Sequence, residues 1–465
     1  MRRPTEKKTT TRSHFDTIVA IATPPGHGGV AIVRLSGPDA LKLARAVFRT
    51  PSGGEFQEWP SHLLRYGRLI DPDTTETIDK CMTVYLAEPS TYTGEETVEF
   101  HLHGSPLVCE LAVRLLTESG ARLAQPGEFT QRAFMNGKLD LTQAESVLDL
   151  IESRTRSQAR LAAQHLDGRF SNRVSQVRAS VLAWLSLMEA EIDFGDEIDN
   201  LPETEHRRLL SEIEAEIEAL LSDAQQGRVA IKGLKTVLMG APNAGKSSLL
   251  NAMLQEDRAL VTPVAGTTRD RIDVDCSLGG VLFNLTDTAG LRADTDDVVE
   301  KLGMEKTQQA VALADFLVLV VDSGDPHFPE QAERPDFILL NKQDLPTRVD
   351  RDVLQRKYPR ARIVSGELLT EEGAEAVVSA LVSEARSRTA TLSGECFSVN
   401  QRHRESLVRC KECLQAISQT LDQELGAEFL ALDLRRAAEH LGEILGLDIT
   451  EEVLDRIFGQ FCLGK

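Results

Sequence analysis

The chain has 465 residues, of which 41% are hydrophobic, 27% are charged and 5% are aromatic. Such proportions indicate a soluble, helix-rich globular protein, and the length suggests about three domains. The formal net charge of −20 makes a broad basic surface for nucleic acid unexpected, so any RNA contact should be local or shared with a partner.

The apolar pattern and the cysteines argue against membrane and secreted proteins. No apolar run approaches the about 18 residues of a membrane span, and the first 15 residues lack the apolar segment of a secretory signal, so we expect a disordered tail there. Seven scattered cysteines form no disulfide framework, which favours a cytoplasmic location. The lone C-x-x-C at residues 410–413 is interpreted as two helix-face cysteines rather than a zinc or redox site.

A small α/β unit is predicted first, over residues 16–125. Its glycines at 26, 28 and 29 fit an anion cradle and a hairpin turn equally well. The expected strands are 16–22, 30–37, 65–70, 80–87 and 97–104, and the expected helices are 39–48 and 105–120.

From about residue 131 the apolar period becomes helical. Thr142 and Glu145 have the spacing of a capping box that opens a helix. A later helix is expected to stop near Gly227, and the helical period returns after about residue 386. Because both helical stretches have one apolar face, we expect them to build a single bundle. Its apolar series are 141, 144, 148 and 151; 174, 177, 181, 184 and 188; 213, 217, 220 and 221; and 407, 410, 414, 417, 421 and 425.

The clearest motif lies between the two helical stretches, in TVLMGAPNAGKSS at residues 236–248. Four strand-forming residues run into Gly240, residues 240–247 match G-x-x-x-x-G-K-[ST], and a helix-like run follows. Glycine lets backbone N–H groups curl around phosphate oxygens, Lys246 supplies positive charge, and the Ser247 hydroxyl is a ligand for Mg²⁺. The alternative is a strand, turn and helix with accidental glycines.

Two further motifs with nucleotide chemistry follow in order. In GTTRD, residues 266–270, Thr268 is suited to close over Mg²⁺ and the γ-phosphate. In VLFNLTDTAG, Asp287 ends a strand as an outer carboxylate near Mg²⁺, and Gly290 is free to reorient when γ-phosphate is bound.

The last motifs concern the base. FILLNKQD ends a buried strand in Asn341, Lys342 and Asp344. A carboxylate accepts two hydrogen bonds from the N1–H and amine of guanine, whereas adenine offers no such pair, so the motif selects GTP. The loop at residues 365–367 is expected to contact the base through a backbone amide.

Two departures from a Ras-like GTPase are informative. Only fourteen proline-rich residues separate the strand DFLVLVVD from FILLNK, so the usual helix there should be short or missing. Leu291 follows DTAG where Ras-like enzymes carry the glutamine that orients water. The hydrolytic machinery must therefore come from elsewhere.

The expected fold is multidomain, α/β plus α, with a helical bundle interrupted by an inserted Ras-like phosphate-loop GTPase domain. The expected domains are an N-terminal α/β domain at 1–130, the first helical part at 131–232, the GTPase domain at 233–385 and the second helical part at 386–465.

Seven segments of the sequence match the signatures of one known family. They are DTIVAIATPPGHGGVAIVRLSG, YTGEETVEFHLHG, PGEFTQRAFMNGKLDLTQAE, GAPNAGKSSLLN, VAGTTRD, DTAGLR and FCLGK. Through them the chain, from about residue 16 onward, resembles the MnmE (TrmE) family of tRNA-modification GTPases. The resemblance implies an N-terminal domain that dimerises and binds a 5-formyl-tetrahydrofolate-type one-carbon cofactor. It also implies a flavin-dependent partner, MnmG (GidA), with which a carboxymethylaminomethyl or aminomethyl group is installed at C5 of the tRNA wobble uridine.

The resemblance also implies folate contacts by matching position, at Arg34, Glu99, Lys138 and Lys465. A pterin edge offers a donor pair to a carboxylate, and a glutamate tail attracts cations. Taken singly, without the resemblance, each residue is more readily interpreted as a surface charge. Cys462 matches the family's near-terminal cysteine, either beside the cofactor as a nucleophile or as a small packed residue.

For hydrolysis the resemblance implies activation by K⁺ and by dimerisation of the nucleotide domains. Asn243 matches the K⁺-ligating asparagine, although an asparagine beside proline is also a common turn former, and Glu300 replaces the missing glutamine as the water-orienting residue. The expected K⁺ ligands are Asn243, Thr262, Val264 and Thr267, and the expected Mg²⁺ ligands are Ser247 and Thr268. The expected catalytic residues are Lys246, Glu300 and Cys462.

The residues expected to bind GTP or GDP are drawn from all of these motifs. It comprises Asn243, Ala244, Gly245, Lys246, Ser247, Ser248, Thr262, Pro263, Val264, Ala265, Gly266, Thr267, Thr268, Asp287, Thr288, Ala289, Gly290, Asn341, Lys342 and Asp344. The leading hypothesis is a K⁺-dependent GTPase of tRNA wobble-uridine modification. The alternatives are a ribosome-assembly GTPase acting as a switch and a folate enzyme regulated by GTP.

Overall fold

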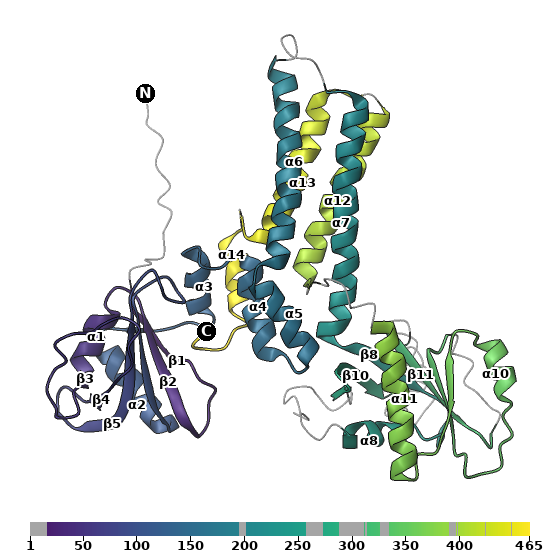
Figure 1. Cartoon of the computed structure of the whole chain (residues 1–465), viewed down its shortest axis with the longest axis horizontal. Helices are drawn as coiled ribbons and strands as arrows, with labels where there is room; N and C mark the ends of the chain where they lie inside the picture. The colour runs from purple at the N-terminus through teal and green to yellow at the C-terminus, as the bar shows by residue number, and fades with distance from the viewer. Residues whose placement is uncertain are drawn as a thin grey trace, which may run out of the picture. The chain divides into compact units, whose positions relative to one another are not determined.

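The computed structural model describes residues 16–194, 201–256, 273–287, 311, 314–325, 334–389, 397, 399–423, 425–447 and 449–465. The chain divides into two compact units, one of Met1–Leu148 with Leu445–Lys465 and the other of Asp149–Ile444. Mixed α/β parts and purely helical parts are both present, as the sequence predicts (Figure 1).

The first unit is built on a seven-stranded sheet with strand order β3-β4-β5-β6-β2-β1-β7. Helices α1 (Ala40–Val47) and α2 (Pro106–Glu118) pack their apolar positions against one face of this sheet, around Val33, Phe100 and Leu116. All five predicted strands are present, and two-residue strands extend the sheet at both edges. The strands are β1 (Ile18–Ile21), β2 (Gly28–Ser36), β3 (Phe48–Arg49), β4 (Arg65–Ile70), β5 (Thr77–Leu86), β6 (Thr97–Gly104) and β7 (Arg122–Leu123).

The last residues of the chain complete the first unit. Helix α14 (Glu451–Phe458) packs against α3 (Glu128–Met135), and Phe458 and Phe461 share a core with the start of α4 (Leu141–Glu152) (Figure 1). Gly127 allows this approach, because a Cβ atom there would lie 2.5 Å from the Phe458 carbonyl oxygen. The core of this unit therefore depends on residues from both ends of the sequence.

The predicted capping box at Thr142 is wrong. Helix α4 begins at Leu141, so Thr142 lies inside it, and its hydroxyl donates to Asp140. Asp140 is the capping residue: its carboxylate accepts from the Gln143 N–H at 2.9 Å, and the Gln143 side chain accepts from the Asp140 N–H. Asp140 and Thr142 could each cap this helix, and Asp140 does so because a carboxylate is a stronger acceptor than a hydroxyl at a helix N-terminus.

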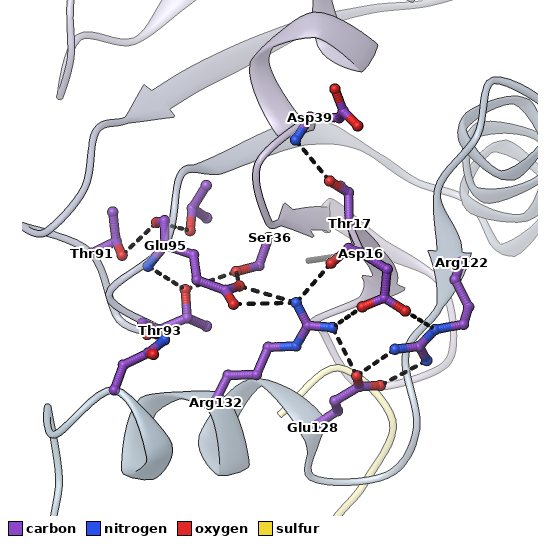
Figure 2. Close-up of polar contacts among 12 residues, drawn as sticks. Asp16, Thr17, Ser36, Asp39, Thr91, Thr93, Glu95, Arg122, Glu128 and Arg132 are labelled. Atoms are coloured by element: carbon purple, nitrogen blue, oxygen red, sulfur yellow. Dashed lines mark hydrogen bonds and ion pairs between the residues drawn. The ribbon is translucent and has the colours of Figure 1, made fainter. Parts of the chain in front are cut away.

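A partly buried cluster of charged residues joins four segments of the first unit (Figure 2). Arg132 on α3 is 5% exposed, and its guanidinium contacts Asp16 at 2.6 Å, Glu128 at 3.0 Å and Glu95 at 3.2 Å. Arg122 binds the same Asp16 and Glu128 at 2.7 and 2.6 Å. The cluster ties the chain before β1 and the loop before β6 to helix α3.

These contacts change the acidity of the cluster. The hydrogen bond from Arg122 lowers the pKa of Asp16. Burial raises the pKa of Glu128, but hydrogen bonds from Arg122 and the Gln125 N–H outweigh it, so that its pKa is lowered overall. Burial disfavours the charged form of Arg132, but Glu95 and the other carboxylates outweigh this and raise its pKa. The folded state therefore favours the ionised forms of Asp16, Glu128 and Arg132.

The second unit contains a bundle of long helices (Figure 1). Its core includes the predicted series from Val174 to Met188, and α5 opens with a capping box between Thr155 and Gln158 that the sequence interpretation missed. Helix α7 passes through Gly227 and ends at Lys232, where Gly233 has φ +81°. The helices are α5 (Arg156–Leu166), α6 (Arg169–Phe194), α7 (Glu203–Lys232), α12 (Gln401–Asp422) and α13 (Ala427–Leu445).

The apolar stripe of α12 is confirmed except at its end. Leu407, Cys410, Leu414, Ile417 and Leu421 are buried, as predicted. Leu425 is exposed because the helix ends at Asp422, before the stripe can continue. Burial raises the pKa of the Cys410 thiol to about 12, so this cysteine is a packing residue.

A six-stranded sheet with order β13-β12-β11-β8-β10-β9 forms the rest of the second unit. All neighbours are parallel except β9, which is antiparallel to β10. Helices α8 (Lys246–Glu256) and α11 (Glu371–Thr389) cover one face and α10 (Arg351–Lys357) the other (Figure 1). The strands are β8 (Leu234–Met239), β9 (Asp273–Leu278), β10 (Val281–Asp287), β11 (Phe316–Asp322), β12 (Phe337–Asn341) and β13 (Arg362–Ser365).

The strand order alone indicates where a ligand site should lie in this sheet. The chain leaves β8 for β10 on one side, and β11 lies on the other side, so the order of strands reverses at the carboxyl end of β8. Ligands of open α/β sheets bind at such a point. None of the helices within the described residues has the length and apolar character needed to cross a membrane.

We predict that Arg132→Met destabilises the first unit by about 3 kcal/mol, because three carboxylates lose their buried partner. Urea unfolding can be followed through Trp59 of this unit in a Trp184→Phe background. Lys42→Met is the matched control: Lys42 pairs with Asp39 at 3.4 Å on an exposed surface, so its loss should cost under about 0.5 kcal/mol. Equal effects of the two substitutions would contradict the role of the cluster.

The same cluster predicts a pH dependence. Asp16 and Glu128 have lower pKa values in the folded than in the unfolded chain, so their stabilisation is complete at neutral pH and is lost as the pH falls below about 5. In Arg132→Met the free energy of unfolding should decline less steeply between about pH 5 and pH 3. Urea titrations at a series of pH values measure both slopes, and parallel slopes would refute the prediction.

Candidate functional site

The phosphate-loop motif lies at the point where the strand order reverses. Strand β8 ends at Met239 and α8 begins at Lys246, as predicted. Gly240 has φ +150°, and a Cβ there would lie 2.2 Å from the Val320 carbonyl oxygen on β11. Asn243 also has positive φ, +61°, which asparagine tolerates better than most residues. The loop is therefore held in a curled conformation between two strands and a helix.

Lys246 points back over its own loop. Its side chain is buried, and Nζ donates to the carbonyl oxygens of Gly240 at 3.1 Å and Ala241 at 2.8 Å. Ser247 and Ser248 follow it as exposed residues in the first turn of α8. A lysine ammonium, an exposed serine hydroxyl and a helix N-terminus fit the charge of phosphate and the oxygen ligands of Mg²⁺.

The base-recognition motif reaches the same loop. Asn341 ends β12, and its Nδ2 donates to the Ala244 carbonyl oxygen at 2.9 Å. The approach requires glycine at 245, because a Cβ there would lie 2.1 Å from this Nδ2. Asn341 is 4% exposed, and its Oδ1 has no hydrogen-bond partner among the described residues. A buried acceptor of this kind is suited to receive an N–H from a ligand.

Lys342 and Asp344 follow at the carboxyl edge of the sheet. Lys342 Nζ lies 2.6 Å from the Asp322 carboxylate at the end of β11, and this contact lowers the pKa of Asp322. Asp344 is exposed, as a carboxylate that pairs with a base must be. The loop after β13 joins the edge through the Gly366 N–H, which donates to the Leu340 carbonyl at 3.0 Å.

Part of the predicted nucleotide site lies outside the described residues. Asp287 ends β10, and in the parallel pairing it lies opposite Leu238 of β8, next to the phosphate loop. The prediction of a short or missing helix between β11 and β12 also concerns residues outside the described ranges. The predicted site residues outside these ranges are Thr262, Pro263, Val264, Ala265, Gly266, Thr267, Thr268, Thr288, Ala289, Gly290 and Glu300.

A second polar site lies in the first unit, on the sheet face opposite α1 and α2. Arg34 on β2 and Glu99 on β6 are directly opposite each other, with Nε 2.8 Å from the carboxylate. The Arg34 guanidinium also lies over the rings of Tyr92 and Phe129, at 5.9 and 5.6 Å. Hydrogen bonds from His101 and Arg34 lower the pKa of Glu99, so it is an ionised acceptor at neutral pH.

The other predicted folate residues differ in how close the structure brings them to Arg34 and Glu99. The Lys465 carbonyl accepts from the Phe129 N–H at 3.2 Å, which places the last residue beside the aromatic ring under Arg34. Lys138 is exposed, and its Nζ donates to the Pro89 carbonyl at 2.8 Å. Cys462 is also exposed. The structure therefore joins Arg34, Glu99 and the backbone of Lys465, and Cys462 adjoins this group through its carbonyl, which accepts from the Lys465 N–H at 3.4 Å. Among the described residues, the side-chain hydrogen bond of Lys138 goes to Pro89 and not to this group.

Comparison with known proteins decides the family. The chain is 39% identical to the tRNA modification GTPase MnmE of Geobacillus kaustophilus over 464 residues, which cover 97% of this chain and all of that protein. It is 40% identical to the protein of the same name from Trichormus variabilis, covering 97% of this chain and 98% of that one.

The chain belongs to the MnmE family of tRNA modification GTPases.

Two family models match in agreement with this. The model of the MnmE helical domain matches residues 141–462, and the model of the GTP-binding protein TrmE N-terminus matches residues 17–138. The crystal structure of the G domain of the T. maritima FeoB iron transporter aligns with 33% of this chain and 98% of that one, at 25% identity and a TM-score of 0.24. At that score the likeness adds nothing to the MnmE assignment.

Three residues of these sites were missed by the sequence interpretation. Asp322 carried a signal, since it ends an apolar strand at the same sheet edge as Asn341. Tyr92 and Phe129 carried none, because one lies in a loop, the other on a helix, and only the tertiary fold brings their rings to Arg34.

We predict that Gly245→Ala abolishes nucleotide binding without unfolding the sheet. The added Cβ would displace Asn341 from the loop, and alanine tolerates φ +110° poorly. Binding of a fluorescent GDP analogue measures the loss. Gly280→Ala is the control, because Gly280 has φ +83° with open space around its Cβ position, so it shares the strain but not the collision. Loss of binding in both variants would contradict the role of the contact.

Proposed function

We propose that this chain is the K⁺-dependent GTP-hydrolysing component of an enzyme complex that modifies C5 of the wobble uridine of tRNA in the cytoplasm. In this proposal the chain is a helical bundle with an inserted Ras-like GTPase domain. The single observation that carries the GTP site is Asn341, whose amide holds the phosphate loop while its buried Oδ1 has no partner within the described part of the chain. Family membership supports the tRNA substrate.

Hydrolysis transfers the γ-phosphoryl group of GTP to water and yields GDP and phosphate. The loop from Gly240 to Lys246 would bind the phosphates through its N–H groups, and Lys246 would exchange its carbonyl contacts for phosphate oxygens. Asp344 would accept the two donors of guanine. Mg²⁺ held by Ser247 and Thr268 would neutralise phosphate charge when bound.

The source of catalysis differs from Ras-like enzymes because Leu291 replaces their glutamine. We assign the orientation of water to Glu300. Potassium, held by Asn243 with Thr262, Val264 and Thr267, would supply positive charge to the leaving phosphate when bound. The exposed position of Asn243 at the turn of the loop is compatible with this role.

The second site is proposed to bind a 5-formyl-tetrahydrofolate-type cofactor, which supplies a one-carbon unit when bound. Glu99 would accept from the pterin edge, with Tyr92 and Phe129 as apolar walls, and Lys138 and Lys465 would attract the glutamate tail. Cys462 is proposed as a reactive thiol near the cofactor. A flavin-dependent partner, MnmG, would complete the chemistry, and tRNA would be shared with it.

The homodimer is proposed to form on the open face of the first sheet. Tyr66, Met82, His101 and Ile32 pair in one row across four strands, on the side opposite α1 and α2. Tyr66 is 54% and Met82 47% exposed, so a second copy would cover apolar surface there. Sedimentation of Met82→Asp should show monomers, and an unchanged dimer would place the interface elsewhere.

The function is tested by mass spectrometry of tRNA nucleosides from a strain that lacks the gene. We expect unmodified C5 at the wobble uridine, restored by the intact gene but not by Lys246→Ala. Normal wobble uridines together with defective ribosomal subunits would favour the ribosome-assembly switch instead.

For Asn243 we expect Asn243→Gly to bind GDP normally but to lose stimulation by K⁺, so that the hydrolysis rates in K⁺ and Na⁺ have a ratio of about one. Glycine keeps the positive φ accessible and removes only the amide oxygen. Rates are measured with and without the flavin partner. A K⁺ stimulation equal to that of the intact chain would remove Asn243 from the cation site.

For the folate site we expect Glu99→Gln to weaken binding of 5-formyl-tetrahydrofolate by about tenfold or more, because a charged acceptor is replaced by a neutral amide. Calorimetric titration measures the affinity. Glu110→Gln, an exposed carboxylate on α2, is the control and should bind as the intact chain does. Unchanged affinity in Glu99→Gln would place the cofactor elsewhere.

A further inference from the structure

The ends of two neighbouring strands meet beside the base-recognition motif. Strand β11 ends at Asp322 and β12 ends at Asn341, and these two residues lie opposite each other in the parallel pairing. Lys342 is the next residue after β12, and its Nζ lies 2.6 Å from Asp322 Oδ2. The side chains are 31% and 22% exposed, so the ion pair is partly shielded from water.

Asp322 is itself held in place. Its Oδ1 accepts from the Gly324 N–H at 2.9 Å, so both carboxylate oxygens have a partner. Ser323 links the same turn to the neighbouring motif: its N–H donates to the Asn341 carbonyl at 3.0 Å, and its hydroxyl contacts Gln343 Nε2 at 2.6 Å. The turn after β11 therefore forms a rigid support beneath the residues that follow β12.

Lys342 needs such a support. Its φ of +61° is rare for a residue with a long side chain, and a lysine has four rotatable bonds whose freedom must be lost when it contacts a ligand. The contact with Asp322 removes this freedom in advance. Lys342 lies between Asn341 and Asp344 in the motif, and the methylene stem of a lysine is an apolar surface on which a flat ring can pack.

We propose that Asp322 is a positioning residue for guanine binding, which fixes the Lys342 side chain in the orientation that the base meets. The proposal rests on the proposed GTP site and extends it to a residue on the neighbouring strand. The competing role is a structural one, in which the pair only stitches the ends of β11 and β12 together.

A double-mutant cycle on the full-length chain separates these roles. Asp322→Asn, Lys342→Met and the double variant are compared with the intact chain for binding of a fluorescent GDP analogue. Methionine keeps an apolar stem and removes the ammonium. We expect each single variant to raise the Kd for GDP about tenfold, and the double variant to be no worse than either single one, because both remove the same contact. Asp322→Glu, which keeps the charge, should recover most of the affinity.

Asp336→Asn is the matched control. Asp336 precedes the opposite end of β12 and pairs with Arg388 at 2.5 Å, so it stitches the same strand away from the base. Melting temperatures of all variants are measured without nucleotide. We expect Asp336→Asn to lower the melting temperature without changing the Kd for GDP.

Three results would overturn the proposal: a GDP affinity in Asp322→Asn equal to that of the intact chain, additive effects in the double variant, or an equal loss of affinity in Asp336→Asn. Failure of the intact chain to bind GDP would instead refute the proposed GTP site itself.

Discussion

The hydrogen bond from the Asn341 amide to the Ala244 carbonyl is the constraint on which the nucleotide site depends. It joins two loops whose residues are 97 positions apart in the sequence. A nucleotide has a fixed distance between its base and its phosphates, so a protein that binds both ends must fix the two loops relative to each other. Glycine at 245 makes the contact possible, and the parallel strands β8, β11 and β12 bring both loops to one edge of the sheet.

The first unit solves a similar problem with charge. Glu95 and Glu128 are largely shielded from water and Asp16 is half-buried, so their charges are most stable where Arg122 and Arg132 reach them (Figure 2). This requirement selects one position of α3 and of the loop before β6. The same helix carries Phe129, and the same loop carries Tyr92, so the cluster also sets the aromatic walls around Arg34.

What the sequence could predict is what is local within it. Apart from the two-residue strands β3 and β7, the strands of both sheets, the phosphate loop and the NKQD motif depend on periodicity or fixed spacing, and the structure contains them within a few residues. The residue that caps α4 was harder to predict from the sequence. Asp140 and Thr142 are both good capping residues, and only the position at which α4 begins decides between them. The predicted helix end near Gly227 was wrong because the packing of a long helix can outweigh the low helix propensity of one glycine. The Lys342 to Asp322 and Arg34 to Phe129 contacts depend on strand order and helix placement, which no local pattern contains.

The contribution of residues 445–465 to the first unit has a consequence for how the protein is made. The sheet of that unit leaves the ribosome first, but Phe458 and Phe461, which close the core beside α4, are synthesised only after the entire second unit. The core between the sheet and helices α1 and α2 draws only on residues 19–121, so it can form early in translation. The core beside α4 must wait for Phe458 and Phe461, and the second unit can fold before that core is closed. The contact of the Lys465 carbonyl with the Phe129 N–H in the second polar site likewise forms only after the second unit has been synthesised.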